Sequence, residues 1–564
     1  MDANRRDGPL IVQKDWTVLL ELSNPKCEAA REEVAQFAEL VSAPPHVHTY
    51  RMTKATLWSA ADRGLSAQSI LESLERFAKY PLGERLKRDI AQTCGSYGVL
   101  RLVRREGRLA LESADPALLE KLMEYECVRT LLGGRRDASS CWVEEANRGA
   151  IKIACVQLGY PVKDLAGYVE GGVLPVRLLE RTRSGKPFAL RRYQLQAVES
   201  FWGGGTEHGG SGIVVLPCGA GKTIVGIAVM ARASTNTLIL TASTTAVRQW
   251  LWEIEDKTDL PSLLTGEYTG DIKQVKPVTV TTYQMLTHRR GAGYSHLELF
   301  RSGNWGLVIY DEVHLLPAPV FRFTAHIQAV RRLGLTATLL REDGREADVF
   351  TLIGPKKLEV GWKSLEKAGW IAQAECHEIR IGMEPEYRER YSAAGERLRF
   401  RLAAENPEKL KVLERLLARH KGDRVLVIGQ FVSQLRKVAS RLGIPLVTGR
   451  TSSDERTRLY QSLRNGDISC LVVSKVANFS VDLPEARVAI QLSGSFGSRQ
   501  EEAQRLGRIL RPKADGGPAY FYTLISVNTK EEEFARKRQS FLVEQGYRYI
   551  IHESWRDSSN VAGS

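Results

Sequence analysis

A glycine-rich turn between two apolar stretches constrains the fold of this chain most strongly. The apolar run Ile213–Leu216 is followed by the turn PCGAGKT over residues 217–223 and by an apolar segment that continues to Met230. A strand, a tight turn and a helix in that order place backbone N–H groups and a helix N-terminus around an anion. Lys222 would reach the β- and γ-phosphates of a nucleotide, and the Thr223 hydroxyl would hold Mg²⁺. The sequence therefore predicts a phosphate-binding loop made of Gly219, Ala220, Gly221, Lys222 and Thr223. Leu216 stands where this motif usually has its first glycine.

The same region begins a long alternation of apolar strand-like runs and helical segments. It extends from Ile213 to about residue 372 and resumes from Arg424 to about Leu524. Strands that alternate with helices are typical of parallel α/β units. We therefore expect an α/β protein with two RecA-like parallel-sheet lobes, preceded by a helix over Pro187–Trp202. The Gly-rich stretch Gly203–Gly212 precedes the first strand, so we interpret it as a flexible connector rather than a second phosphate loop.

The residues before this alternation mix strand-like and helix-like segments. Leu10–Val12 and Thr17–Leu22 predict one hairpin, and Gly98–Glu112 predicts another. Ser66 is placed to cap a helix whose apolar face holds Ile70, Leu71, Leu74 and Phe77. We therefore expect an α+β domain here, and we find no catalytic constellation in it.

The length of 564 residues predicts several domains, at about 150 residues each. We expect an N-terminal domain over 1–175, a first lobe over 176–375, a second lobe over 376–545 and a C-terminal tail over 546–564. The second lobe is expected to carry a small helical, thumb-like insertion at about 384–405.

An acidic pair follows a second apolar run, where a phosphoryl-transfer site needs it. Leu307–Tyr310 leads directly into Asp311-Glu312-Val313-His314. Asp311 would coordinate Mg²⁺, and Glu312 would orient or deprotonate the attacking water. Adjacent acids are also common on protein surfaces, but their position after a buried-type strand favours the catalytic role. His314 either connects this site to the segment Thr336-Ala337-Thr338 or is an ordinary strand-end histidine.

Arginines recur at every third position in the second α/β region. Arg505, Arg508 and Arg511 would present their guanidinium groups on one side of a helix. An arginine that reaches the transferring phosphoryl group stabilises its charge in the transition state. The alternative is a solvated basic helix. In the catalytic interpretation the ATP site lies in a cleft between the lobes, with Arg508 and Arg511 as catalytic groups and Arg505 also facing the nucleotide.

Charge and composition limit the partners. Lysine and arginine number 80 and aspartate and glutamate 66, which gives a net charge of +14. This surplus suits an anionic polymer or a membrane surface. No apolar run approaches the roughly 20 residues that span a bilayer, and the first residues lack the apolar stretch of a secretory signal. Eight scattered cysteines without a CxxC pair indicate reduced thiols, so we expect a cytoplasmic protein without membrane contact.

In their order, these motifs resemble the XPB family of superfamily 2 helicases. Further segments carry the same resemblance, and Arg341-Glu342-Asp343 matches the charged triplet that is close to diagnostic of that family. The others are Phe188–Gln194 (adenine-reading segment), Thr241–Ser243 with Arg248-Gln249-Trp250 (motif Ia), Thr281-Thr282-Tyr283, Leu333–Thr338 (motif III), Ser474–Pro484 (motif V) and Gln504–Arg511 (motif VI).

The resemblance implies an ATP- and Mg²⁺-dependent 3′ to 5′ DNA helicase or translocase that acts in nucleotide excision repair. It implies further nucleotide contacts by Arg191, Gln194, Gln504 and Asp482. It also implies DNA contacts by Arg248, Thr282 and the triplet Arg341-Glu342-Asp343. Taken by itself, a triplet of charged residues after a strand is usually an ordinary solvated loop.

The predicted thumb-like insertion interleaves basic and aromatic residues. The segment Glu386–Ala404 interleaves Tyr387, Tyr391 and Phe400 with the arginines Arg388, Arg390, Arg397, Arg399 and Arg401. Guanidinium groups can hold phosphates and aromatic rings can stack on bases, so these arginines are candidate DNA contacts. The alternative is an amphipathic helix pair with a solvated face.

The N-terminal segments also resemble prokaryotic members of the family, through His48–Arg51 and Leu57-Trp58. The resemblance implies that the N-terminal domain binds distorted DNA. The human-type extensions that join the transcription factor TFIIH have no counterpart here, so we expect a prokaryotic enzyme of the cytosol or nucleoid. A structure-specific repair nuclease, as in archaeal relatives, is a candidate partner, and a monomer is expected.

Two other functions stay open on the sequence alone. The first is a DNA-binding scaffold or remodeller whose ATPase switches its grip on DNA without processive unwinding. The second is an RNA helicase, although DEVH and TAT stand here in place of the RNA-type DEAD and SAT motifs.

Overall fold

The structure is a computed structural model of the chain. It describes residues 7–42, 46–166, 171–205, 209–287, 289–290, 293–294, 303–315, 329–337, 349, 352–474, 486–494, 499–507, 509–511 and 515–553. These residues form two compact units. Apart from two short pieces, Ser42–Pro44 and Pro217–Ala220, which belong to the second unit, the first unit runs to Glu359 and the second begins at Val360.

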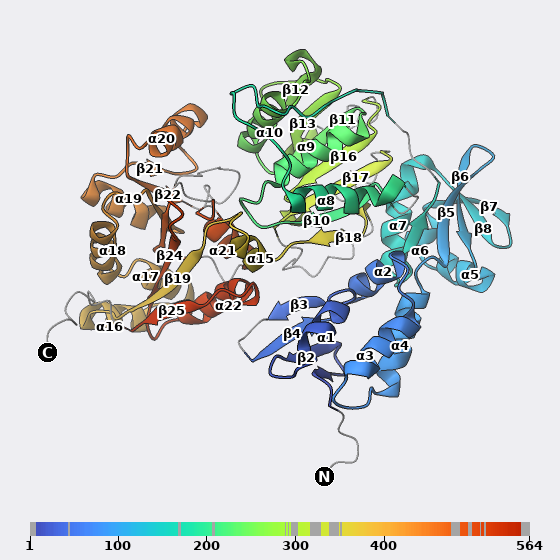
Figure 1. Ribbon diagram of the computed structural model, residues 1–564, viewed down its shortest axis with the longest axis horizontal. Coiled ribbons are helices and arrows are strands. Elements are labelled where there is room, and N and C mark those ends of the chain that lie inside the picture. Colours follow the sequence, from blue (N-terminus) through green and yellow to red (C-terminus); the bar gives the residue numbers. More distant parts are fainter. Residues whose placement is uncertain are drawn as a thin grey trace, which may run out of the picture. The chain divides into compact units, whose positions relative to one another are not determined.

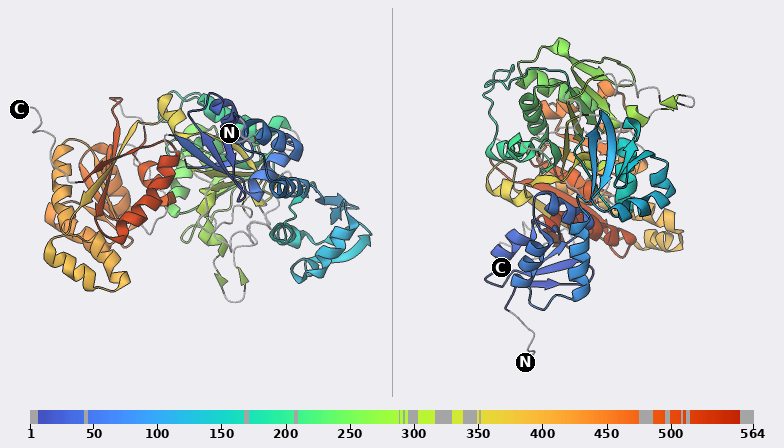
Figure 2. Two further views of the ribbon diagram at one scale, coloured as in Figure 1. Left: turned by 90° about the horizontal axis from the view of Figure 1, so that it is seen from below. Right: turned by 90° about the vertical axis from the view of Figure 1, so that its right-hand side faces the viewer.

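The N-terminal residues form two separate sheets, coloured dark blue and cyan in Figures 1 and 2. The first has the strand order β1-β2-β4-β3 and packs against helices α1 to α4 around Leu20, Leu57 and Ile70. Both predicted hairpins are present, and the Ser66 side chain accepts a hydrogen bond from Ser69 N–H at the start of α3 as expected. The bounds are β1 Leu10–Val12, β2 Thr17–Glu21, α1 Cys27–Val34, β3 Glu39–Ser42, β4 Val47–Arg51, α2 Lys54–Asp62, α3 Ala67–Phe77 and α4 Glu84–Gly95.

The second sheet has its own hydrophobic core, around Leu102, Leu111 and Ile151. Its strand order is β7-β8-β6-β5-β9, and the strands are antiparallel except for the pair β5 and β9. The stretch that we expected as one α+β domain thus contains two cores. The bounds are β5 Leu100–Arg105, β6 Arg108–Ser113, α5 Pro116–Glu124, α6 Glu126–Arg129, β7 Leu132–Asp137, β8 Ser140–Val143, α7 Arg148–Gln157 and β9 Val162–Asp164.

The first lobe is a seven-stranded parallel sheet in the order β12-β13-β11-β16-β17-β10-β18 (Figure 1). β11 is buried throughout and β16 is buried as far as Tyr310, and both are mainly apolar, as in a sheet covered on both faces. The bounds are α8 Arg192–Trp202, β10 Ser211–Val215, α9 Lys222–Ala233, β11 Thr237–Thr241, α10 Thr244–Lys257, β12 Thr265–Tyr268, β13 Val278–Thr282, α11 Tyr283–Thr287, β16 Leu307–Asp311, β17 Arg331–Thr336 and β18 Lys356–Glu359.

The second lobe repeats this architecture. Its seven parallel strands follow the order β21-β22-β20-β23-β24-β19-β25. The fold is therefore α/β with two RecA-like lobes, as the sequence predicted. The bounds are α15 Trp362–Lys367, β19 Ala374–Ile381, α16 Pro385–Ala393, α17 Glu396–Ala404, α18 Glu408–Arg419, β20 Val425–Gly429, α19 Val432–Leu442, β21 Leu446–Val447, α20 Ser453–Asn465, β22 Cys470–Ser474, β23 Val488–Gln491, α21 Arg499–Gly507, β24 Ala519–Ser526, α22 Lys530–Glu544 and β25 Tyr549–His552.

Two helices differ from the sequence prediction. The helix expected from Pro187 begins only at Arg192, because Arg191 is extended and acts as its N-cap. The basic helix expected to continue to Arg511 ends at Gly507.

An irregular segment, residues 171–186, lies along the first lobe before α8 and contains a turn at 183–185. Leu174 N–H donates to Ser234 C=O at 2.9 Å, Leu179 N–H to Lys257 C=O at 3.0 Å and Arg183 N–H to Asp256 C=O at 2.8 Å. The Arg183 guanidinium also donates to the carbonyls of Thr258 and Leu260. This segment is therefore fastened to the lobe by its backbone and not only by its ends.

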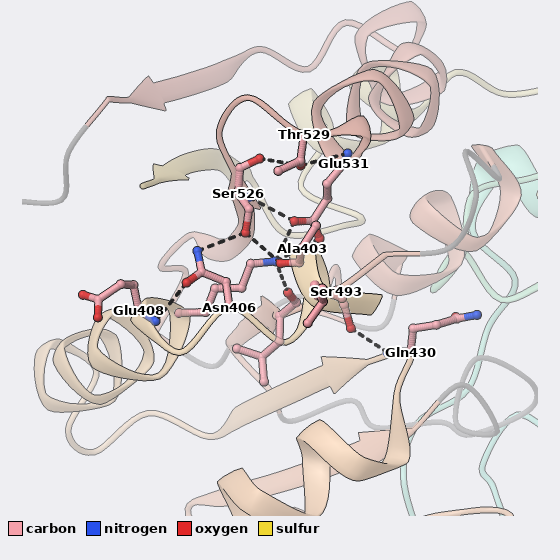
Figure 3. Close-up of polar contacts among 12 residues, drawn as sticks. Ala403, Asn406, Glu408, Gln430, Ser493, Ser526, Thr529 and Glu531 are labelled. Atoms are coloured by element: carbon pink, nitrogen blue, oxygen red, sulfur yellow. Dashed lines mark hydrogen bonds and ion pairs between the residues drawn. The ribbon is translucent and has the colours of Figure 1, made fainter. Parts of the chain in front are cut away.

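A buried polar cluster ties together the strand ends of the second lobe (Figure 3). The Lys409 ammonium donates to both Glu531 carboxylate oxygens and to Leu492 C=O, each at 2.8 Å, and both charged side chains are 1% exposed. Ser526 N–H donates to the same carboxylate at 3.0 Å, and the Ser526 hydroxyl donates to Ala403 C=O at 2.7 Å. The cluster thus joins β23, β24, α18 and α22 to the C-terminus of α17.

Among the residues that the structure describes, no helix combines the length and the apolar character that crossing a membrane requires.

Candidate active site

The predicted phosphate loop has the strand–turn–helix geometry expected of it. β10 ends at Val215, and α9 begins at Lys222. Gly219 and Gly221 have φ values of +80° and +79°, a region that residues with a Cβ seldom adopt. Ala220 between them is fully buried, and the Thr223 side chain is partly exposed in the first turn of α9. The first amides of the 12-residue helix α9 are thereby directed at the turn, as anion binding requires.

Gln194 lies directly against this loop. It is 4% exposed, and a Cβ placed on Gly221 would come within 2.6 Å of its Nε2. Its Oε1 accepts a hydrogen bond from Arg191 N–H at 2.9 Å, which fixes the direction of the amide. The Arg191 guanidinium donates to the Tyr193 hydroxyl at 3.1 Å. The structure thus brings Gln194 to the phosphate loop, and Arg191 bonds to Gln194 from the start of α8.

The acidic motif meets the same loop from β16. Glu312 Oε1 lies 3.3 Å from Lys222 Nζ. Glu312 has a φ of +51°, a strained value for a residue with a side chain, and such strain collects at functional sites. Lys222 follows β10 and Glu312 follows β16, so the two residues meet only because the fold brings the ends of these strands together.

His314 makes the connection that the sequence left open. Its Nδ1 lies 2.8 Å from the Thr336 hydroxyl at the end of β17 and 3.4 Å from Glu312 Oε2. The histidine is 5% exposed and therefore belongs to the interior of the site. The interpretation as a link to motif III is confirmed, and that of an ordinary strand-end histidine is wrong.

Asp311 is held by two aromatic residues. Trp250 Nε1–H donates to Asp311 Oδ2 at 2.8 Å, and the Tyr283 hydroxyl donates to Asp311 C=O at 2.8 Å. Burial, and then the neighbouring Glu312 carboxylate, raise the pKa of Asp311 to about 6, while the Trp250 hydrogen bond and Lys222 oppose that rise. These two contacts were not predicted from the sequence. Trp250 and Tyr283 are nevertheless the last residues of two segments that resemble family motifs.

The second lobe presents motif VI differently from the prediction. Arg505 is fully buried, and its guanidinium donates to Gln491 Oε1 in β23. In the same helix, Glu502 Oε2 lies 3.5 Å from Arg538 Nε of α22, and both side chains are buried. The expectation that Arg505 faces the nucleotide is therefore wrong, because this face of α21 packs into the lobe. Gln504 is 8% exposed, Arg511 follows the helix and is partly exposed, and Arg508 and Asp482 lie outside the described residues.

The candidate DNA contacts fall into three groups. Arg248 in α10 is half-exposed, with its Nε 3.7 Å from Glu267 Oε2, whereas Thr282 at the end of β13 is buried. The expected thumb-like insertion is a helix pair, α16 and α17, joined by a hydrogen bond from the Tyr387 hydroxyl to Leu402 C=O. Arg388, Arg390, Arg397 and Arg401 of this pair are exposed. Arg341, Glu342 and Asp343 lie outside the described residues.

Three family descriptions match segments of the chain. Residues 365–562 match the ERCC3/RAD25/XPB C-terminal helicase, and residues 187–341 match the res subunit of type III restriction enzymes. Residues 10–137 match a helicase conserved C-terminal domain, and here they form the N-terminal four-stranded sheet and part of the five-stranded one. The three matches together cover most of both lobes and of the N-terminal region.

Curated relatives match over almost the whole chain. "DNA 3'-5' helicase XPB" of Kineococcus radiotolerans is 51% identical over 546 residues, which are 97% of this chain and 96% of that protein. The protein of the same name from Mycobacterium tuberculosis is 49% identical over 558 residues, 99% of each chain. The XPB subunit of the general transcription and DNA repair factor IIH of Antonospora locustae is 36% identical over 99% of this chain and 84% of that protein. The chain therefore belongs to the XPB family of superfamily 2 helicases.

Proposed function

We propose that this chain is an ATP-dependent 3′ to 5′ DNA helicase or translocase that moves on or opens duplex DNA during DNA repair. The observation that carries the proposal is the convergence of Lys222, Asp311 and Glu312 on one phosphate loop. The names of its bacterial relatives, which match over nearly their full length, supply the polarity and the DNA substrate.

The Lys222–Glu312 pair suggests how nucleotide binding prepares the reaction. A nucleotide γ-phosphate that reaches the loop would compete with Glu312 for the Lys222 ammonium. Lys222 would then balance phosphate charge, and the released carboxylate would orient or deprotonate the attacking water. The His314 ring, 3.4 Å from Glu312 Oε2 and 2.8 Å from the Thr336 hydroxyl, would keep that carboxylate in place.

The residues of the site fit Mg²⁺. This small, hard cation prefers oxygen ligands and usually keeps several waters. The Asp311 carboxylate and the Thr223 hydroxyl supply such oxygens, one at a strand end and the other in the first turn of α9. When bound with ATP, Mg²⁺ would neutralise phosphate charge, and Asp311 and Thr223 would orient it.

Motif VI is the proposed source of further positive charge. Arg508 and Arg511 would stabilise the transferring phosphoryl group, and Gln504 and Asp482 would contact the nucleotide. We further propose that the protein acts as a monomer in the prokaryotic cytosol or nucleoid, together with a structure-specific repair nuclease.

ATP hydrolysis and strand separation test the proposed function. We expect the full chain to hydrolyse ATP in the presence of Mg²⁺, to be stimulated more by single-stranded DNA than by RNA, and to lose this activity in excess EDTA. Stopped-flow assays on forks should show displacement when the loading strand has a free 3′ end, and none when it has only a free 5′ end.

The same assays separate the alternatives. DNA-stimulated hydrolysis without displacement of either fork favours the remodeller whose ATPase switches its grip on DNA. Stronger stimulation by RNA favours an RNA helicase. Absence of hydrolysis with every nucleic acid contradicts all three motor functions.

The five-stranded sheet of the N-terminal region offers a surface for distorted DNA. Two guanidinium groups lie over the Trp142 ring of β8, that of Arg108 at 4.7 Å and that of Arg136 at 5.7 Å from the ring centroid. Both arginines are exposed and the ring is partly exposed. An aromatic face beside guanidinium groups can stack on an unpaired base while the charges hold the phosphates. We propose that this face contacts the distorted strand.

Replacement of Trp142 by alanine should weaken binding to a bubble or mismatched duplex. Loss of one base-stacking ring corresponds to about 1–3 kcal/mol, or roughly 5- to 150-fold in Kd. Fluorescence anisotropy with a fluorescent bubble measures this change. Tyr80→Ala is the matched control, because Tyr80 is an exposed aromatic residue beside the other N-terminal sheet. Equal Kd values for the two variants would contradict a role of the Trp142 face.

A further inference from the structure

Two aromatic side chains hold the aspartate of the acidic motif from opposite ends of the residue. Trp250 bonds to its carboxylate and Tyr283 bonds to its backbone carbonyl, each at 2.8 Å. We propose that Trp250 and Tyr283 are positioning residues for ATP hydrolysis, which fix Asp311 and the start of Glu312 against the phosphate loop. This inference rests on the function proposed above, and it assigns a role to residues outside the phosphate loop and the acidic motif.

The position of the Trp250 indole is set by the helix that carries Lys222. Trp250 is 1% exposed, and a Cβ on Gly226 of α9 would lie 2.4 Å from its Cη2. A glycine inside a helix costs about 1 kcal/mol relative to alanine, and here it provides the space that the indole occupies. The ring therefore packs between α10 and α9, and its N–H is directed at Asp311.

The single donor of the indole suits a buried carboxylate. An indole N–H donates and cannot accept, so Trp250 can bond to the ionised form of Asp311 without exchanging roles. Hydrogen bonds to charged groups are stronger than those between neutral groups. Trp250 thus holds one carboxylate oxygen, which leaves the other oxygen, Oδ1, for a cation or its water.

Tyr283 acts on the backbone one bond away from Glu312. It is 4% exposed, and its hydroxyl can only donate to the carbonyl oxygen of Asp311, 2.8 Å away. The carbonyl that it holds belongs to the peptide that joins Asp311 to Glu312. This peptide precedes the strained φ of +51° at Glu312. Tyr283 therefore fixes the plane from which the Glu312 side chain turns toward Lys222.

Trp250→Phe tests the first contact, because it keeps an aromatic ring and removes the N–H. We expect kcat of DNA-stimulated ATP hydrolysis to fall about tenfold or more, as for the loss of one hydrogen bond to a charged group. KM for ATP should stay close to the wild-type value, because the phosphate loop is unchanged. Binding of Mn²⁺ in the presence of a non-hydrolysable ATP analogue, measured by electron paramagnetic resonance, should weaken in parallel.

Trp58→Phe is the matched control. Trp58 is also 1% exposed, and its indole N–H donates to Thr93 C=O and to the Ser96 hydroxyl in the N-terminal region. It loses the same atoms and a comparable hydrogen bond, so it measures the general cost of losing a buried indole N–H away from Asp311. We expect this variant to keep the wild-type kcat and Mn²⁺ affinity at a temperature where both variants are folded.

Tyr283→Phe tests the second contact without the volume change. We expect a lower kcat with unchanged Mn²⁺ affinity, because this hydroxyl holds the peptide next to Glu312 and not the carboxylate. The proposal is overturned if kcat and Mn²⁺ affinity of both Trp250→Phe and Tyr283→Phe equal those of Trp58→Phe. If the wild-type chain hydrolyses no ATP, the proposed function fails instead, and the Mn²⁺ measurement then tests the positioning role alone.

Discussion

Replacement of Lys222 by alanine is expected to abolish ATP hydrolysis while DNA binding stays near the wild-type level. Lys222 is the first residue of α9, and its Nζ lies 3.3 Å from Glu312 Oε1. Its ammonium group is the cation of the phosphate loop that would meet the β- and γ-phosphates. Removal of one preorganised charge-stabilising donor costs roughly 10²–10³-fold in rate. Steady-state ATPase assays with saturating single-stranded DNA measure the loss, and anisotropy with the same DNA measures binding.

Two controls make this result specific. Lys276→Ala removes an exposed lysine from the same lobe, and it should leave kcat unchanged. Melting temperatures of the two variants should agree within a few degrees, since removal of a partly exposed ion pair changes stability by only about 1 kcal/mol. Retained hydrolysis in Lys222→Ala would show that the turn is not a catalytic phosphate loop. Equal loss of DNA binding would show that Lys222 contacts DNA.

Replacement of Lys409 by methionine should destabilise the second lobe by about 3–5 kcal/mol. The reason is the partner that stays behind, because Glu531 is 1% exposed and would keep a buried carboxylate without its cation. Burial lowers the pKa of Lys409, and Glu531 opposes that shift, so the charged state of the lysine depends on the pair. Urea denaturation followed by hydrogen exchange of β23 amides measures the change locally, since a chain of several domains does not unfold in one step.

A double replacement separates the charge effect from the packing effect. Lys409→Met combined with Glu531→Leu removes both charges, and we expect it to be more stable than the single variant, because no uncompensated carboxylate stays buried. Some loss should persist, since Ser526 N–H and Leu492 C=O lose their partners. Lys537→Met breaks an exposed pair with Glu533 and should cost less than about 1 kcal/mol. A double variant as unstable as Lys409→Met would contradict the explanation.

Features that depend only on residues close together in the sequence could be predicted from it. The strand–turn–helix around Gly219 to Lys222 and the strand before Asp311 are examples, because glycine conformation and apolar runs act over a few positions. The end of α21 was mispredicted. Regular spacing of Arg505, Arg508 and Arg511 says nothing about where a helix stops, and this one stops at Gly507.

Contacts that depend on strand order could not be predicted. Trp250 and Asp311 are 61 residues apart, and Tyr283 and Asp311 are 28 apart. They meet because β13, β11 and β16 are neighbours in the sheet, an order that alternating apolar runs do not encode. The burial of Arg505 has the same origin, since its partner Gln491 lies on β23. The division of the N-terminal region into two hydrophobic cores depends on which apolar residues contact one another in space. The number of apolar residues in the sequence does not reveal it.

The segment 171–186 has a mechanical consequence for a protein that moves along a polymer. It connects the N-terminal region to α8 and is bonded to the first lobe at Ser234, Asp256 and Lys257. A pull on the N-terminal region would load this segment and the backbone hydrogen bonds that fasten it to the first lobe. Tension would therefore enter the first lobe through the helices α9 and α10, one of which begins with Lys222 while the other carries Trp250.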